Sequence, residues 1–97
     1  MIFPVVALLV AISGCDRLAI YQARESVERA LKDPSSAQFR NERVTKDGIV
    51  CGEVNGKNSF GAYSGFARFY SSKRAGEYSA VIETKELPAF VFDDMCD

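Results

Sequence analysis

The chain has 97 residues, which fits one small domain and leaves little room for a second. Its 12 basic and 13 acidic side chains nearly cancel, so no strong electrostatic field would attract nucleic acid or an anionic membrane surface. The chain contains no histidine, which removes Ser-His-Asp and Cys-His mechanisms from consideration. Composition therefore argues against a nucleic-acid-binding protein and against the commonest enzyme classes.

Residues 1–14, MIFPVVALLVAISG, carry no charged side chain. This apolar run is shorter than the roughly 20 residues that a membrane-spanning helix needs, but it matches the apolar core of a signal peptide. No Lys or Arg precedes it, so only the α-amino group supplies positive charge in front of the run. A buried N-terminal helix or strand is the alternative. We predict a signal peptide over residues 1–14 and a single domain over residues 15–97.

The end of the apolar run resembles a bacterial lipobox, in which an apolar residue and two small residues precede a cysteine. The matching residues here are ISGC, Ile12 to Cys15. The resemblance implies that Cys15 is acylated and becomes the N-terminus of an envelope protein that faces the periplasm. Asp16 resembles a signal for retention in the inner membrane, whereas Arg17 leaves the choice between inner and outer membrane open.

Residues 16–32 have the pattern of an amphipathic helix. Charged pairs four residues apart are expected on its outer side. One apolar stripe recurs at helical spacing and is expected to face the domain's own sheet: Ile20, Ala23, Val27, Ala30 and Leu31. A membrane-surface or partner-helix role is the alternative. Pro34 disfavours helix at Asp33, which can cap a second short turn.

The rest of the chain indicates an antiparallel meander. The turn formers Lys46, Asp47 and Gly48 separate the first two expected strands. The expected strands are 39–45, 49–54, 66–71, 78–84 and a short last strand at 89–92. One helix followed by such a meander predicts an α+β domain, in which the N-terminal amphipathic helix packs on a small antiparallel sheet.

Two further cysteines, Cys51 and Cys96, are predicted to form a disulfide bond. If Cys15 carries lipid, they are an even pair in an oxidising compartment. In the chain-entropy model, a bridge closing a loop of about 45 residues stabilises the fold by about 4 kcal/mol. A metal site is the weaker alternative, because these cysteines lack the closely spaced partners of a zinc site. We expect no metal and no cofactor.

The connection at residues 55–65, NGKNSFGAYSG, combines glycines, asparagines and aromatic rings. It offers no nucleophile or base with an evident activating partner, so we predict no catalytic residue here and no enzymatic activity. Its glycine spacing does not match a phosphate-binding loop. One interpretation is loop geometry, with Phe60, Tyr63 and Phe66 filling the core. The other is a recognition surface made by Lys57, Asn58 and Tyr63.

Two segments carry a family resemblance: LKDPSSAQFRN, and VCGEVNGKNSFGAYSGFARF after it. They resemble small proteobacterial and phage-encoded lipoproteins or secreted proteins with DPSSAxFR and VCGxVNxKNxFGxYxGFxxF segments. The likeness covers residues 31–70. It implies a shared domain and marks signature positions without giving them a role: Asn55, Lys57, Asn58, Gly61, Tyr63, Gly65 and Phe66.

Some lipoproteins of this size are made by prophages and exclude further phages by binding an outer-membrane receptor from the periplasmic side. The sequence thus leads to the hypothesis of a lipid-anchored envelope protein that binds another protein, with a superinfection-exclusion factor as its most concrete form. The expected binding residues are Asn55, Lys57, Asn58, Tyr63 and Phe66. The alternatives are a periplasmic inhibitor of a cell-wall hydrolase and an accessory subunit of an envelope complex. Neither nucleic acid nor a small-molecule substrate is expected.

Overall fold

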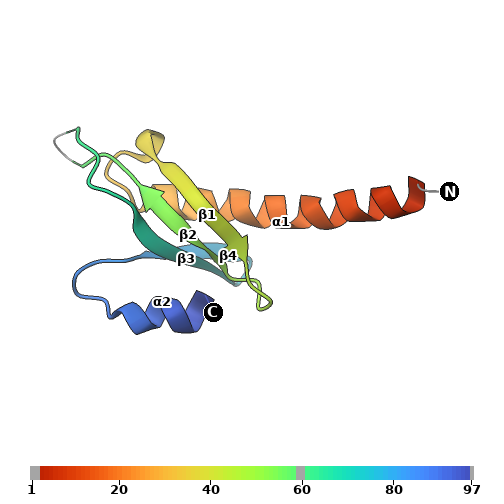
Figure 1. The fold of residues 1–97 in the computed structure, drawn as a ribbon. Coiled ribbons are helices and arrows are strands. Elements are labelled where there is room, and N and C mark those ends of the chain that lie inside the picture. Colours follow the sequence, from red (N-terminus) through yellow and green to blue (C-terminus); the bar gives the residue numbers. More distant parts are fainter. Residues whose placement is uncertain (1–2, 59–60, 97) are drawn as a thin grey trace.

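The structure is a computed structural model that describes the backbone of residues 3–58 and 61–96 and the side chains of residues 16–58 and 61–96. It has the predicted α+β architecture, with an N-terminal helix on a four-stranded antiparallel sheet (Figure 1). A second, short helix follows the sheet. The elements in chain order are α1 (Phe3–Arg29), the 3-10 turn η1 (Pro34–Ser36), β1 (Gln38–Val44), β2 (Val50–Asn55), β3 (Ala67–Arg74), β4 (Glu77–Ile82) and α2 (Ala89–Cys96).

Helix α1 supplies one side of the core. Ala23 and Val27 are fully buried, as the predicted stripe requires, while Ile20 and Leu31 are partly buried. These side chains pack against one face of the sheet, where Val50, Val54 and Phe69 are buried. Ala30 is exposed, because it lies beyond the end of the helix.

The helix differs from the predicted span at both ends. It begins at Phe3 and continues through Cys15 without a break. It ends at Arg29 instead of residue 32, because the amides of Ala30 and Leu31 donate to carbonyls three residues back and tighten the last turn. Among the described residues, no helix is long and apolar enough to cross a membrane.

The turn predicted after Pro34 is present as η1. Asp33 stands at its N-cap position, but its carboxylate caps no backbone amide. The Oδ1 atom instead accepts a hydrogen bond from the Ser35 hydroxyl at 2.8 Å. The backbone carbonyl of Asp33 accepts from the Ser36 amide, which closes the turn.

The sheet has the order β1-β2-β3-β4, and each strand is antiparallel to its neighbour. The first four predicted strands are confirmed, with ends shifted by a few residues. Strand β3 runs on to Arg74, because only Ala75 and Gly76 make the turn into β4. Both have positive φ, of 51° and 85°, as a tight two-residue hairpin requires.

The predicted last strand at residues 89–92 is wrong, because this segment belongs to helix α2. Phe92 packs on Tyr70, and Cys96 is bonded to Cys51. Cys51 and Tyr70 are direct partners on neighbouring strands, so Phe92 and Cys96 must also lie close together. Side chains four residues apart lie about 6 Å apart on a helix but about 13 Å apart along a strand. Tertiary contacts thus outweigh the strand propensity of Phe-Val-Phe.

The two helices lie against opposite faces of the sheet. On β3, Phe69 belongs to the core beneath α1, while the next residue, Tyr70, stacks edge-to-face against Phe92 of α2 with ring centroids 5.6 Å apart. Successive side chains of a strand point to opposite faces, so the alternation on β3 separates the two layers. The face that meets α2, called the second face below, carries the charged residues described next.

Candidate interaction surface

The predicted recognition loop is an extension of the β2–β3 hairpin with its own hydrogen bonds. Asn55 closes its neck, where the buried side-chain Oδ1 accepts the Gly65 amide at 3.1 Å. Further out, Lys57 and Tyr63 form an isolated antiparallel bridge. Asn55 is therefore placed for a structural role, whereas Lys57 and Tyr63 face each other on the hairpin extension.

The turn η1 supports this hairpin from the side. The amide of Lys57 donates to the Ser36 hydroxyl at 2.8 Å, and the Tyr63 hydroxyl donates to the Ser36 carbonyl at 3.0 Å. The Lys57 ammonium lies 5.7 Å from the centroid of the Tyr63 ring, within cation–π range. The DPSSA segment thus holds the Lys57–Tyr63 pair in place. Tyr63 nevertheless keeps 42 % of its surface exposed.

Asn58 shapes the tip of the hairpin. Its amide donates to the Ala62 carbonyl at 2.9 Å, and its side-chain Oδ1 accepts the Ala62 amide at 3.2 Å. Gly61 closes the turn onto the Asn58 carbonyl and has a positive φ of 79°. Asn58 itself is exposed. Phe60, which the sequence suggested as a core or contact residue, lies outside the described residues.

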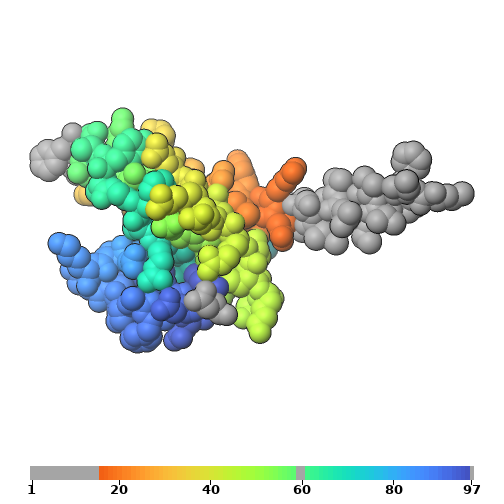
Figure 2. Space-filling model, viewed as in Figure 1, coloured from red at the N-terminus to blue at the C-terminus, as the bar shows by residue number. Residues whose placement is uncertain are grey.

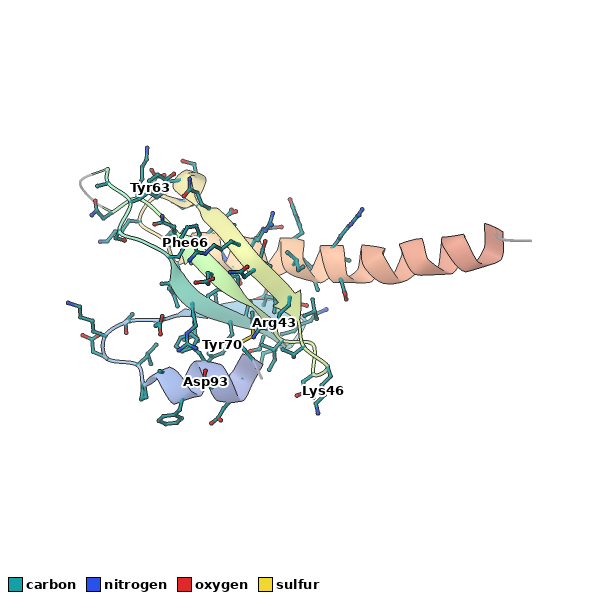
Figure 3. All side chains as sticks on the ribbon, viewed as in Figure 1. Arg43, Lys46, Tyr63, Phe66, Tyr70 and Asp93 are labelled. Carbon is teal, nitrogen blue, oxygen red and sulfur yellow. A yellow bond between two sulfur atoms is a disulfide. The ribbon has the colours of Figure 1, made fainter. Side chains whose placement is uncertain are left out.

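Phe66 lies apart from this group, at the base of the hairpin. The Arg40 guanidinium stacks over its ring at 3.8 Å from the centroid. Arg40 also pairs with Glu53 across β1 and β2 at 3.2 Å. Figure 3 shows Tyr63 and Phe66 at the hairpin end of the sheet, away from α2. Of the five predicted binding residues, the structure brings together Lys57, Asn58 and Tyr63.

A hollow of about 330 Å³ lies on the second face, between β1 and α2. Its charged rim includes Arg43, Glu53, Arg68 and Asp93, which sequence reasoning did not single out. The sequence does offer one indication of such a charged face. Charged residues that alternate with apolar ones in a strand must lie on the face opposite the core. In Figure 3, Arg43, Tyr70 and Asp93 gather near the disulfide.

A β-bulge in β1 directs the side chains on one side of this hollow. The register slips between Arg40 and Arg43, so both arginines reach the second face although they are three residues apart. Asn41, in the bulge, has a positive φ of 56° and donates to Glu53 at 2.6 Å. Glu42 turns to the other face, where it pairs with Arg24 of α1.

The hollow is neutralised by its own residues. Hydrogen bonds from Arg40 and Asn41 lower the pKa of Glu53 from its ordinary value. Asp93 and Glu83 hold the Arg68 guanidinium and raise its pKa. The charged groups of this face are thus paired with one another, Arg68 of β3 with Asp93 of α2 and Arg40 of β1 with Glu53 of β2. Ion pairs this exposed add little to stability.

The disulfide prediction is confirmed. Cys51 and Cys96 are bonded at 2.04 Å, and the bond ties β2 to the last turn of α2. The lipidation predicted at Cys15 falls on a residue whose side chain the structure does not describe, and it stays a prediction. Within residues 16–58 and 61–96, whose side chains the structure describes, no group of three metal-ligating side chains comes together.

Comparison with protein-family models, with curated proteins and with solved structures finds no match to this chain.

Proposed function

We propose that this chain is a lipid-anchored protein of the bacterial envelope that faces the periplasm and binds another protein through Lys57, Asn58 and Tyr63. The observation that carries the proposal is the half-exposed Tyr63 ring, which is fixed by its hydroxyl bond to Ser36 and flanked by Lys57. A rigid aromatic side chain loses little conformational entropy on binding, which is why such residues dominate protein interfaces.

The position of the hairpin supports this role. Helix α1 leaves the domain at one end of the molecule, and the hairpin lies at the opposite end (Figure 1). If Cys15 carries the acyl chains, α1 stands on the membrane side and the hairpin points away from it. A partner would then reach Lys57, Asn58 and Tyr63 without a clash with the bilayer.

Site-specific photocrosslinking in cells tests the proposal. A photoreactive amino acid replaces Tyr63 in one variant and Phe90, a more exposed aromatic on α2, in the control. We expect a discrete covalent adduct from position 63 and none from position 90. Adducts from position 90 alone would place the interface elsewhere and contradict the proposal.

The most concrete form of this function is superinfection exclusion. Expression of the protein is then expected to lower the plating of phages that share one outer-membrane receptor. Tyr63→Ala is expected to abolish this resistance while the protein still accumulates, and Phe90→Ala is expected to leave it intact. Unchanged plating of every phage tested would rule out this form while leaving protein binding open to the crosslinking test.

A second candidate is inhibition of a cell-wall hydrolase, which the hairpin favours because the exposed Tyr63 ring and the neighbouring Lys57 could enter an active-site cleft. The purified protein is then expected to slow muramidase turnover, and a Lys57→Ala variant to slow it less. Muramidase rates that do not respond to the protein would exclude this candidate.

A further inference from the structure

Two large apolar side chains are exposed side by side on α1. Among the described residues, the large hydrophobics with high exposure are Leu18 at 58 %, Tyr21 at 63 %, Tyr63 at 42 % and Phe90 at 63 %. Leu18 and Tyr21 are three residues apart on a helix, so they share one side of it. They form a small apolar patch, called the Leu18–Tyr21 patch below.

The fold leaves this patch without a contact in the domain core. The opposite side of α1 carries the buried residues Ala23, Ser26 and Val27, which meet the sheet. In Figure 2, the residues just after position 15 project from one end of the coloured surface. The patch is therefore exposed close to residue 16, where the described side chains begin, and it is not part of the core.

We propose that the Leu18–Tyr21 patch contacts the headgroup layer of the bilayer that holds the protein, an inference that rests on the proposed anchor at Cys15. With a helical rise of 1.5 Å per residue, Leu18 and Tyr21 lie about 4.5 and 9 Å along the axis from Cys15. The headgroup layer is about 5–8 Å thick. A modest tilt of α1 toward the patch places both side chains within it.

The neighbouring residues on the patch side of α1 fit this environment, and the exposed Asp16 lies on nearly the opposite side of the helix from Leu18. Tyrosine is enriched at membrane interfaces, because its ring enters the apolar boundary while its hydroxyl stays hydrated. Arg17 is exposed beside the patch and can meet lipid phosphates. Glu25 is exposed one helical turn after Tyr21. A carboxylate near lipid phosphates is unfavourable, so we expect the contact with the bilayer to end before Glu25.

The test measures proximity to lipid directly. The full-length lipidated protein is placed in nanodiscs of phosphatidylethanolamine and phosphatidylglycerol that contain a lipid spin-labelled near the headgroup. We expect the side-chain NMR signals of Leu18 and Tyr21 to lose most of their intensity. The signals of Phe90, as exposed as Tyr21, are expected to keep theirs.

Each outcome of the test decides a separate point. The intact mass of the same sample shows whether Cys15 is acylated; an unacylated chain overturns both the proposed anchoring and this inference. An acylated protein whose Leu18 and Tyr21 signals stay intense overturns the inference alone. Signal loss that depends on the number of protein copies per disc, and not on the spin label, would identify a second copy as the occupant and also overturn it.

A matched pair of variants guards against indirect effects. In the unmodified protein the spin label is also expected to weaken the signal of the neighbouring Ile20 methyl group. Leu18→Ser combined with Tyr21→Ser is expected to restore that signal, because the helix no longer tilts toward the lipid. Phe90→Ser is expected to leave the Ile20 signal as it is in the unmodified chain. Both sets of substitutions lie at exposed positions, so both variants should fold.

Discussion

At the scale of single residues, Gly52 shows how tightly side chains of the neighbouring strands β1 and β3 cover the backbone of β2. A Cβ atom at Gly52 would lie 3.0 Å from a ring carbon of the buried Phe69 and 3.1 Å from Cγ of Glu42. Both neighbours are fixed, Phe69 by the core and Glu42 by its ion pair with Arg24. The backbone of β2 therefore has no room for a side chain at this position.

Gly52→Ala is expected to lower the free energy of unfolding by about 1–3 kcal/mol, the usual cost of overpacking a core. Gly56→Ala is the matched control, because its Cβ would meet only the end of the flexible Leu31 side chain, at 3.3 Å. Urea denaturation of the two variants measures the difference. Equal losses would show that Phe69 or Glu42 can move aside.

The Glu53 carboxylate predicts a specific response to acid. In the folded protein, a hydrogen bond from Arg40, which has the larger effect, and one from Asn41 lower the pKa of this carboxylate. A group with a lowered folded-state pKa stabilises the fold above its unfolded-state pKa, and this contribution is lost as the pH falls through the folded-state value. Stability should therefore begin to fall below pH of about 4.3, the ordinary value for glutamate.

Glu53→Gln is expected to flatten this part of the acid response. Urea midpoints at successively lower pH values measure it, with Glu77→Gln as the control, since Glu77 is exposed at the turn into β4. An acid response that is as steep in Glu53→Gln as in the unmodified protein would assign it to other carboxylates.

At the scale of elements, the β3–β4 turn contains a correctable strain. Ala75 adopts a positive φ of 51°, a conformation that disfavours residues with a Cβ, whereas Asn tolerates it. Asn followed by Gly is also the preferred pair for such a hairpin, and Gly76 is already in place.

Ala75→Asn is expected to raise the free energy of unfolding by about 0.5–1 kcal/mol. Ala62→Asn is the control, because Ala62 is exposed in the other hairpin and is not among the residues with positive φ. Thermal unfolding of both variants gives the comparison, and a gain from Ala62→Asn alone would refute the explanation by turn geometry.

At the scale of the whole molecule, the disulfide decides whether α2 stays on the sheet. Helix α2 has eight residues, too few to be stable alone in water. Its anchors are the Cys51–Cys96 bond, the buried Phe92 ring and the ion pair of Asp93 with Arg68. The core beneath α1 lies on the other face and depends on none of these groups.

The combined change Cys51→Ala and Cys96→Ala is expected to cost about 4 kcal/mol, the loop-closure term for this separation. Hydrogen exchange should become fast at the amides of α2 first, while Val27 and Phe69 keep more protection. Reductant added to the unmodified protein should give the same order, and loss of protection throughout the chain at once would show a single cooperative unit.

Much of this architecture could be predicted from local sequence patterns. The apolar stripe that contains Ala23 and Val27 predicted the helix. Segments of alternating apolar and polar residues, separated by turn-forming residues, predicted the strands. The C-terminal helix could not be predicted in this way, because its conformation depends on the spacing of Cys51 and Tyr70 on two other strands. The ion pairs of the second face could not be predicted for a similar reason, because they join residues far apart in the chain.

The candidate site was predictable in part. Lys57, Asn58 and Tyr63 share the hairpin, as their closeness in sequence suggested. The support that Ser36 gives to this hairpin was not visible, because the contact spans 21 residues to Lys57 and 27 to Tyr63. That contact joins the DPSSA segment to the glycine-rich segment in the fold of this chain.

The β1 bulge gives this strand one extra residue relative to β2. Deleting Asn41 would restore a regular ladder in which Arg40 and Arg43 are two residues apart and still share the second face. Phe39 would keep its pairing with Val54 and its edge-to-face contact with Phe69. A further deletion between Arg40 and Arg43 would instead turn Arg40 toward the core and Phe39 away from it. Strand β1 should therefore tolerate the loss of one residue at the bulge but not of two.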